Sequence, residues 1–354
     1  MAIQITRGDL LRQEVDAIIN TVNCVGVMGK GIALQFKNKW PENFKHYEKA
    51  CKAGEVRPGK MLVHELGRLG GKPNFIINFP TKDHWRGKSQ LSFIEEGLDD
   101  LVRVIREHGI TSIAMPPLGC GNGGLNWSVV RPLIERKLNA LDNTLEVRLF
   151  APNEAPEAAS MIIRTKRPNM TAGRAVLIKL LSAYRETGYL LSKLEVQKIG
   201  YFAHVAEVLP RLNYSKNRYG PYSEVLNHAL LKMNGHFITG FGDNDKSEAQ
   251  ISVVEGAIKE ADDFLENEAH ALGAFQRIGK LIDGFESPYG MELLATVHWV
   301  AAHDVAIPTV ENVAQGICSW EPSNPAWGKR KKTLMSEQHI QVALDRLKET
   351  DWLQ

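Results

Sequence analysis

Apolar and polar positions alternate along the first 150 residues in a way that predicts strands and helices in turn. Apolar residues recur at helical spacing between Leu91 and His108, and Gly109 follows as a stop signal. Short runs rich in β-branched residues between such segments predict strands. Strands that alternate with helices are typical of a sheet covered on both faces. The expected strands are 3–6, 16–23, 61–66, 74–79, 112–115 and 145–150, and the expected helices are 32–40, 42–53, 91–108 and 127–138.

The pattern changes after about residue 150. The stretch 151–170 holds three prolines and little periodicity, which is typical of a linker. From Thr171 onward the apolar spacing is helical, with one face formed by Leu177, Leu180, Leu181 and Tyr184. We expect further helices at 194–209, 222–233, 249–265, 298–304, 311–317 and 337–347. The chain therefore reads as an α/β domain at 1–155, a linker at 156–170 and a mainly α-helical domain at 171–354.

Composition agrees with a soluble globular protein, since 44% of the 354 residues are hydrophobic and 24% are charged. No apolar run approaches the length of a membrane span, and the N-terminus has no secretory pattern. The four cysteines are scattered, which argues against a disulfide framework and a structural zinc site. We expect a cytoplasmic protein with no membrane partner, no metal and no cofactor.

Charge is distributed unevenly along the chain. Residues 1–150 carry 21 Lys and Arg against 16 Asp and Glu, whereas residues 151–354 carry 22 against 25. Such asymmetry points to partners rather than to fold. The acidic excess is concentrated at 241–268, in Asp243, Asp245, Glu248, Glu255, Glu260, Asp262, Asp263, Glu266 and Glu268.

Two glycine-rich stretches each follow an expected strand and lead into an expected helix. They are NCVGVMGKGIALQF at 23–36 and PPLGCGNGGLNW at 116–127. Ligands of α/β sheets bind beyond the carboxyl ends of strands, and a glycine loop that opens a helix suits a phosphate. Neither stretch has the spacing of a dinucleotide-binding motif or a P-loop, and a tight turn is the alternative for each. Together they favour a pyrophosphate ligand.

The segments RGDLL, IINTVNCVGVMGKGIALQF and MPPLGCGNGGLNW resemble a macrodomain, the ADP-ribose-binding module, over roughly the first 150 residues. The segment NFPTKDHWRG is similar to the branch that contains the terminal ADP-ribose protein glycohydrolase, and within it to the antitoxin family of the DarT–DarG pairs. This resemblance implies a three-layer α/β/α fold with a mixed sheet. It also implies a hydrolase that removes ADP-ribose from thymidine in single-stranded DNA, with ADP-ribose as product.

The resemblance also implies roles for individual residues. Asp9 would accept a hydrogen bond from the adenine amino group, and Asn23 would lie at the distal ribose. Without the family, a helix N-cap and an Asx-turn are the alternatives for these two side chains. Cys120 would contribute its backbone amide rather than a nucleophilic thiol. The expected substrate-binding residues are Gly8, Asp9, Asn20, Thr21, Asn23, Gly29, Lys30, Gly31, Thr81, Gly119, Cys120, Gly121, Asn122 and Gly123.

Lys82 is the catalytic candidate that the resemblance implies. A neutral amine could attack the opened sugar and form a Schiff base, and burial or a nearby cation such as Lys30 would favour the neutral form. A charged Lys82 could instead assist departure of the thymine. The related protein-directed enzyme carries an acid in its second glycine loop, where this sequence has Gly123. Asp83 and His84, which follow Lys82, are the possible accessory residues.

Contacts with DNA are less strongly marked in the sequence. Trp85 could stack a base or belong to the core. Lys37, Lys39, Lys82, Arg86 and Lys88 are expected near the mouth of the site, where they could touch phosphates. The basic GKRKK at 328–332 could contact nucleic acid or form a loop between helices.

The second half suggests a protein partner. The segments LSKLEVQKIGYFAHVAEV and YGPYSEVLNHAL weakly resemble SocA-like antitoxin domains. An acidic surface could occupy the basic cleft of a DNA-binding toxin, so the cognate DarT toxin is the expected partner beside single-stranded DNA. Three alternatives stay open: an ADP-ribose reader without catalysis, an antitoxin that acts by interaction alone, and a hydrolase acting on protein carboxylates or O-acetyl-ADP-ribose.

Overall fold

The computed structural model describes residues 2–67, 71–139, 141, 145–152, 162–186, 191–241 and 250–353. The chain divides into two compact units, the first reaching to Lys166 and the second beginning at Arg167. Residues 153–161 lie outside the described residues, so the expected boundaries at 155 and 170 stay a prediction. Among the described residues, no helix is both long enough and apolar enough to cross a membrane.

The first unit is built on a six-stranded sheet with the strand order β1-β6-β5-β2-β4-β3. All neighbouring strands are parallel except β3, which runs antiparallel to β4. The carboxyl ends of the five parallel strands therefore meet at one edge, where ligands of such sheets bind. The strands are β1 Ala2–Thr6, β2 Ala17–Val22, β3 Leu62–Glu65, β4 Phe75–Pro80, β5 Ser112–Met115 and β6 Glu146–Phe150.

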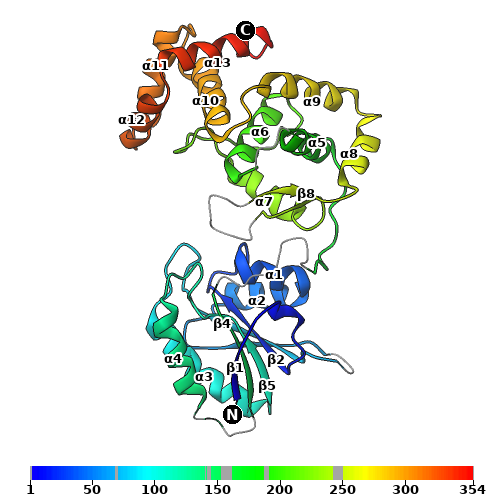
Figure 1. Cartoon of the computed structure of the whole chain (residues 1–354), viewed down its shortest axis with the longest axis vertical. Coiled ribbons are helices and arrows are strands. Elements are labelled where there is room, and N and C mark those ends of the chain that lie inside the picture. Colours follow the sequence, from blue (N-terminus) through cyan, green and yellow to red (C-terminus); the bar gives the residue numbers. More distant parts are fainter. Residues whose placement is uncertain are drawn as a thin grey trace. The chain divides into compact units, whose positions relative to one another are not determined.

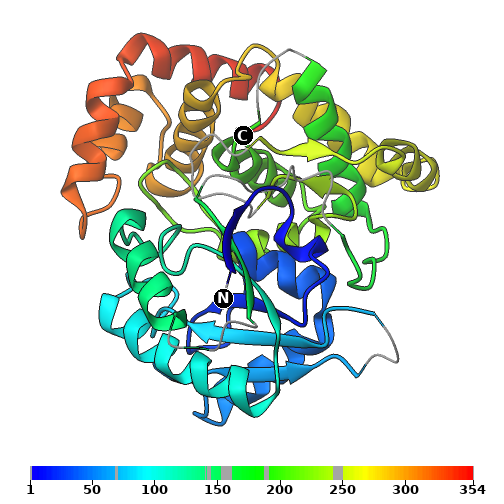
Figure 2. The same ribbon diagram turned by 60° about the horizontal axis from the view of Figure 1, so that its bottom comes forward.

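Helices cover both faces of this sheet, as Figure 1 and Figure 2 show. Alternate strand residues point to opposite faces, so Ile18 and Ile76 join the core under α1, whereas Ile19 and Ile77 join the core under α3 and α4. The predicted three-layer fold with a mixed sheet is thus confirmed. The helices are α1 Gly31–Lys39, α2 Pro41–Lys52, α3 Leu91–Glu107 and α4 Trp127–Leu138, with a 3₁₀ turn at Leu10–Arg12.

A close approach between α3 and β4 fixes the strand that precedes Lys82. Gly97 of α3 faces the ring of Phe79, and a Cβ atom on Gly97 would lie 2.3 Å from that ring. Only glycine fits this distance, and Phe79 is fully buried beneath the helix. The end of β4, and with it Lys82, is therefore held against a packed core.

The second unit is mainly helical, as predicted, with a short hairpin of β7 and β8. Residues Leu177, Leu180, Leu181 and Tyr184 of α5 are all buried in its single large core. The elements are α5 Ala172–Glu186, α6 Lys193–Val205, α7 Glu224–Met233, β7 Ile238–Thr239, β8 Ser252–Val253, α8 Ala257–Leu265, α9 Ala269–Ile282, α10 Pro288–Trp299, the π-helix η3 Val300–Asp304, α11 Val310–Cys318, α12 Pro325–Leu334 and α13 Glu337–Glu349.

The expected helix at 249–265 is wrong in its first half. Residues 252–253 form β8, and the helix begins only after Gly256. Gly256 has a φ of +80°, which a helix does not continue through. Three helices, α9, α10 and α12, were not predicted as such. Buried residues surround α10, α12 is mostly polar and basic, and α9 contains Gly273 and Gly279.

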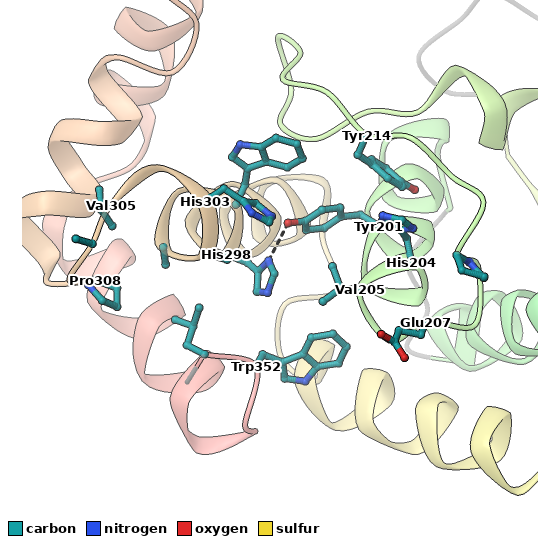
Figure 3. A pocket seen from close by; sticks show the side chains of 16 residues that line it. Tyr201, His204, Val205, Glu207, Tyr214, His298, His303, Val305, Pro308 and Trp352 are labelled. Carbon is teal, nitrogen blue, oxygen red and sulfur yellow. Dashed lines mark hydrogen bonds between the residues drawn. The ribbon is translucent and has the colours of Figure 1, made fainter.

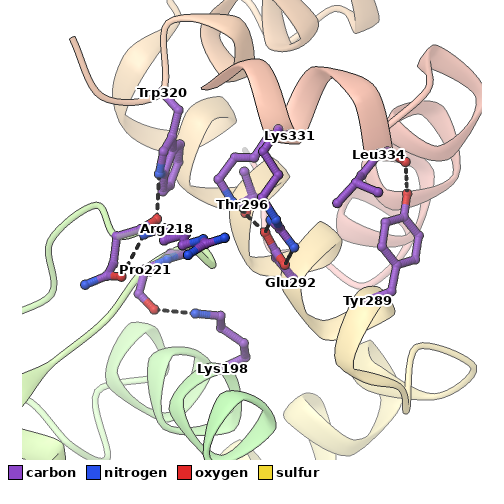
Figure 4. A network of polar contacts seen from close by, with 11 residues as sticks. Lys198, Arg218, Pro221, Tyr289, Glu292, Thr296, Trp320, Lys331 and Leu334 are labelled. Carbon is purple, nitrogen blue, oxygen red and sulfur yellow. Dashed lines mark hydrogen bonds and ion pairs between the residues drawn. The ribbon is translucent and has the colours of Figure 1, made fainter. Parts of the chain in front are cut away.

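The GKRKK segment is a helix and not a loop, because residues 328–332 lie inside α12. Lys331 is fully buried, and its Nζ atom donates to Oε1 of Glu292 at 2.8 Å (Figure 4). Arg330 donates to the same carboxylate at 2.7 and 3.2 Å. These two cations hold α12 against α10, so they are not available to contact nucleic acid.

Candidate functional site

Lys82 lies where three loops meet at the carboxyl edge of the sheet. It follows the last strand residue of β4 by two positions, and its Nζ atom donates to the carbonyl oxygen of Asn122 in the second glycine loop. A carbonyl accepts a hydrogen bond from an amine or an ammonium, so this contact orients Lys82 without fixing its charge. The catalytic role itself stays a prediction.

The first glycine loop is shaped by Asn23. The Nδ2 atom of Asn23 donates to the carbonyl of Val27 at 2.6 Å, and its Oδ1 accepts from the amide of Val25 at 3.0 Å. The hydroxyl of buried Tyr47 donates to the carbonyl of Asn23 at 2.7 Å. This is the Asx-turn that the sequence left as an alternative. A ribose could contact only those donor and acceptor positions of the Asn23 side chain that the turn does not use. The part of Tyr47 in holding this loop was not predicted from the sequence.

Cys24 ties the first loop to the segment that carries Lys82. Its amide donates to the carbonyl of Asp83 at 3.0 Å, and its thiol donates to the carbonyl of Lys82 at 3.4 Å. Burial, with a smaller contribution from the charge of Asp83, raises the pKa of the Cys24 thiol to about 12. The thiol therefore stays protonated at neutral pH and serves as a donor that positions the backbone of Lys82.

The second glycine loop packs against Ser89. Gly119 has a φ of +68°, and a Cβ atom on Gly123 would lie 2.2 Å from the carbonyl oxygen of Gly119 and 2.3 Å from Oγ of Ser89. The amide of Ser89 donates to the carbonyl of Gly123 at 3.0 Å. No residue larger than glycine fits at position 123 without displacing this backbone. Ser89 was missed, because nothing in its local sequence marks it as part of a loop 30 residues away.

Cys120 lies in the same loop, with its amide donating to the carbonyl of Pro117 at 3.1 Å. A phosphate would therefore compete with this turn hydrogen bond. Burial raises the pKa of the Cys120 thiol to about 11, so the thiol is mostly protonated at neutral pH. Gly121 beside it has open space where a Cβ would lie.

The two glycine loops approach each other at the start of α1. Gly31, with a φ of +55°, is the first residue of α1, and a Cβ atom on it would lie 3.5 Å from Nδ2 of Asn122. Lys30 precedes it as the N-cap residue, and its side chain makes no capping hydrogen bond. The N-terminus of α1 therefore lies beside Asn122 of the second loop, and a helix N-terminus at that place is suited to bind phosphate.

Asp9 lies beyond the end of β1, at the same edge of the sheet, and follows Gly8, whose φ is +100°. Its Oδ1 accepts from the amide of Leu11 at 2.8 Å, and its Oδ2 lies 3.2 Å from Nε of Arg12. Asp9 thus is the N-cap of a short 3₁₀ turn. A carboxylate has about four lone-pair sites, so an adenine amino group could still be accepted.

Asn20 is fully buried and belongs to a chain of amides in the core. Its Nδ2 donates to Oδ1 of Asn78 at 2.9 Å, and Nδ2 of Asn78 donates to Oδ1 of Asn43 at 2.8 Å. In this arrangement the side chain of Asn20 joins β2 to β4. Thr81 is also buried, and its amide extends the pairing of the two strands by donating to the carbonyl of Val22 at 2.9 Å.

The remaining predicted contacts differ in how accessible they are. Thr21 and Gly29 are partly buried, in β2 and in the first loop. Lys39 is buried, and its Nζ donates to the carbonyl of Leu11, so it does not offer its charge to DNA. Lys37 lies over the ring of Phe44 at 4.1 Å.

An exposed aromatic group follows Lys82. His84 and Trp85 are stacked with ring centroids 5.4 Å apart, and the guanidinium of Arg86 lies 4.5 Å from the Trp85 ring. Val25 and Val27 of the first loop are also exposed. This side of the site therefore offers aromatic and apolar surface to an extended partner, and Trp85 is not part of the core.

Comparison with known proteins places these features in context. The family model described as Macro domain matches residues 19–134. A DNA ADP-ribosyl glycohydrolase of Thermus aquaticus is 44% identical over 345 residues, which cover 98% of this chain and 92% of that protein. A DNA ADP-ribosyl transferase–DNA ADP-ribosyl glycohydrolase fusion protein of Thermosipho africanus is 35% identical over 43% of this chain and 42% of its own length. The solved macrodomain of Mycobacterium tuberculosis DarG is 55% identical over 43% of this chain and 99% of that chain, with a TM-score of 0.42.

Proposed function

The chain belongs to the family of DNA ADP-ribosyl glycohydrolases, and on this premise we propose that it releases ADP-ribose from thymidine in single-stranded DNA, with Lys82 as the catalytic residue. The family membership and the expected hydrolase class follow from similarity over nearly the whole chain. The observation that carries the proposal is the position of Lys82, whose amine contacts the second glycine loop at the edge of the sheet. An ADP-ribose reader has no need of an amine at that place.

We assign Lys82 to the departure of the base rather than to a lasting covalent intermediate. In the related protein-directed enzyme an acid in the second glycine loop resolves the lysine intermediate, and Gly123 leaves no room for a side chain at that position. A charged Lys82 can stabilise the negative charge that develops on thymine as the bond from C1″ to nitrogen breaks. Water then adds to C1″, the thymine takes up a proton, and ADP-ribose leaves. Asp83 and His84, both exposed beside Lys82, are the candidates to activate that water.

The aromatic group beside Lys82 supports single-stranded DNA as the substrate. Base stacking on an exposed aromatic ring contributes about 1–3 kcal/mol per base and does not depend on sequence. Trp85 is 41% exposed, and the guanidinium of Arg86 lies over its ring. A base could stack on the ring while the guanidinium contacts a neighbouring phosphate. We propose that a base next to the modified thymidine stacks here.

The proposal is tested with a single-stranded oligonucleotide that carries ADP-ribosyl-thymidine and with a peptide that carries ADP-ribosyl-glutamate. The wild-type chain should remove the ADP-ribose mass from the oligonucleotide, and Lys82→Ala should not. Faster release from the peptide would favour protein carboxylates as the substrate. Release by Lys82→Ala at the wild-type rate would reject the catalytic role of Lys82, and His84 would become the next candidate for that role. Incubation with cyanoborohydride should leave the mass of the protein unchanged, because a trapped adduct would indicate the Schiff base.

We also propose that the second unit binds and neutralises a cognate DarT toxin. The Thermosipho relative, whose name joins a transferase to a glycohydrolase, supports such a pairing. The acidic segment at 241–268 is the candidate surface. Asp243, Asp245 and Glu248 lie outside the described residues. Within the rest, Asp262 pairs with Lys179 at 2.8 Å and Asp263 with Lys259 at 2.7 Å, and Glu260 pairs with Arg167.

Acids that already form ion pairs within the second unit are weaker candidates for contact with a toxin. Glu255, Glu266 and Glu268 are exposed and are the acids to reverse first. Changing them to lysine should weaken toxin binding by slowing association, with an effect that shrinks as salt rises. Toxin neutralisation that persists in this triple variant with Lys82 disabled would reject the acidic surface.

A further inference from the structure

The second unit contains a cavity of about 860 Å³ that no part of the proposed reaction uses (Figure 3). It lies between the end of α6, the π-helix η3 and the segment after α13. Aromatic rings make up much of its wall. These are Tyr201, Tyr214, Trp299 and Trp352.

The lining residues carry few charges. Among the described residues that line the cavity, Glu207 is the one carboxylate and none is a lysine or arginine. The guanidinium of Arg277, which is not a lining residue, lies 5.1 Å from the centroid of the Trp352 ring. His298 is neutral at physiological pH, because burial, with a smaller contribution from His303, lowers its pKa to about 4. The hydroxyl of Tyr201 lies 2.8 Å from Nδ1 of His298 and locks that ring in place. The cavity is therefore aromatic with a single negative group at its rim, which suits a cation and disfavours a phosphate.

Glu207 occupies a backbone position that favours glycine. After α6 the amide of Val208 donates to Ala203 and the amide of Glu207 donates to His204, which is the Schellman pattern. Glu207 has a φ of +62° at the position where such motifs usually have glycine. A side chain is retained here at a cost in backbone energy, and such outliers cluster at binding sites.

A second acidic residue sits in the same kind of position near the cavity. Asp351 has a φ of +57° and ends α13 in an equivalent Schellman pattern, just before Trp352. Its side chain does not line the cavity. These are the two non-glycine residues with positive φ in the part of the chain that the structure describes. Asp351 thus provides a matched control for Glu207.

The helix that forms the opposite wall is also irregular. After Trp299 the α10 helix widens into the π-helix Val300–Asp304, which carries His303 into the wall. Such insertions are rare and frequently lie at functional sites. The Nε1 atoms of Trp299 and Trp352 are buried without a hydrogen-bond partner among the described residues. Three irregular features therefore lie at one cavity: the positive φ of Glu207, the π-helix, and the two indole nitrogens without a partner among the described residues.

We propose that this cavity receives an arginine side chain of a basic protein partner, with the guanidinium stacked on the aromatic wall and paired with Glu207. This proposal rests on the partner binding proposed above and identifies its anchor. Arginine fits better than lysine, because its planar, weakly hydrated group stacks on aromatic rings and binds a carboxylate with two hydrogen bonds. A cavity of this volume also has room for the residues that flank the arginine.

The first test uses small probes on the full chain. N-acetyl-arginine methylamide should shift the indole N–H resonances of Trp299 and Trp352, and N-acetyl-citrulline methylamide, which has the same shape without charge, should not. Glu207→Gly should abolish the shifts. At the same time it should raise the melting temperature by about 2 °C, because glycine is favoured at that φ. Equal shifts with both probes, or shifts unchanged in Glu207→Gly, would overturn the proposal.

The second test uses the cognate DarT toxin. Glu207→Gln should weaken its binding on the order of tenfold, the effect expected for loss of one desolvated charge pair. Asp351→Gly should stabilise the second unit in the same way as Glu207→Gly and leave binding unchanged. Equal affinity of the toxin for wild type and Glu207→Gln would overturn the proposal that Glu207 pairs with an arginine of the toxin. If the wild-type chain does not bind the toxin at all, the proposed partner is wrong. The experiment with the small probes then decides whether the cavity binds an arginine side chain.

Discussion

The two units build their candidate sites in opposite ways. In the first, three loops at the carboxyl ends of neighbouring parallel strands supply backbone amides, glycines and one lysine, so little beyond the strand order is needed to bring them together. In the second, the cavity wall is made of side chains from α6, η3 and the C-terminal segment, and the lining residues run from Tyr201 to Leu353. A site made of backbone is marked in the sequence, whereas a site made of side chains appears only once the fold is known.

The largest expected effect concerns Lys82. Replacing Lys82 by Met should lower the glycohydrolase rate on the modified oligonucleotide by about 10³–10⁴-fold, since one group that stabilises the leaving base would be lost. Binding of free ADP-ribose should change by less than about threefold, because the glycine loops that hold the phosphates remain. Single-turnover rates and calorimetric titration with ADP-ribose measure the two effects.

A matched control for Lys82 lies in the same loop. Lys88→Met removes an exposed cation near the mouth, and the rate at low salt should fall only slightly. Equal losses in the two variants would mean that Lys82 acts as a general DNA contact. The first unit would then bind DNA without a catalytic role for Lys82. Both units would be binding modules, and the contrast between a catalytic and a binding unit would no longer hold.

The next effect concerns stability and falls in the second unit. Glu292 is buried, and burial would raise its pKa, but the hydrogen bonds and charges of Arg330 and Lys331 outweigh this and hold the pKa below its usual value. Glu292→Gln removes the counter-ion of buried Lys331, which must then either stay charged without it or lose its proton, and should destabilise the second unit by about 3 kcal/mol.

Thermal unfolding followed by calorimetry measures this loss, and the exposed Glu349→Gln should show almost none. The glycohydrolase rate at 25 °C should be the same in both variants, because the reaction is assigned to the first unit. A lower rate in Glu292→Gln, measured where the chain is fully folded, would show that the two units are coupled.

A smaller effect separates two glycines of one loop. Gly123→Ala places a methyl group 2.2 Å from the carbonyl of Gly119, so the loop must move, at a cost of about 2 kcal/mol in stability. Affinity for ADP-ribose should fall with it. Gly121→Ala meets no protein atom and should leave the stability unchanged. An equal loss of stability in the two variants would mean that the close contact at Gly123 does not determine the shape of the loop.

The glycines of this loop show which parts of the candidate site can be predicted from the sequence. The pattern of Gly119 to Gly123 after a strand is local, so both the loop and its place at the sheet edge could be predicted. Ser89 and Tyr47 were not foreseen, because each reaches its partner across the tertiary fold. Lys331 reads as a surface charge until Glu292, 39 residues away, is placed beside it. Its environment is a property of packing and not of local sequence.

The smallest effect concerns a carboxylate of the first unit far from the reaction. Asp16 lies at the start of β2, at the end of the sheet opposite Lys82, where its Oδ2 accepts from the amide of Thr111 at 2.9 Å and its Oδ1 lies 3.0 Å from Nζ of Lys72. Burial would raise its pKa, but the hydrogen bonds from Thr111, Lys72 and Ser112 outweigh it and lower the pKa to about 2.

Because the folded pKa of Asp16 lies below its ordinary value of 3.8, the stabilisation is fully present above pH 4 and is lost as the pH falls toward 2. Asp16→Asn should therefore cost about 1 kcal/mol at pH 7, a value reduced for solvent screening, and almost nothing at pH 2. Hydrogen exchange of the β2 and β5 amides measures this difference locally. The glycohydrolase rate should not change, because Asp16 stabilises the sheet at the end opposite the proposed site. A slower rate in Asp16→Asn would mean that strand positions are transmitted through the sheet to Lys82, and that the site depends on more than its three loops.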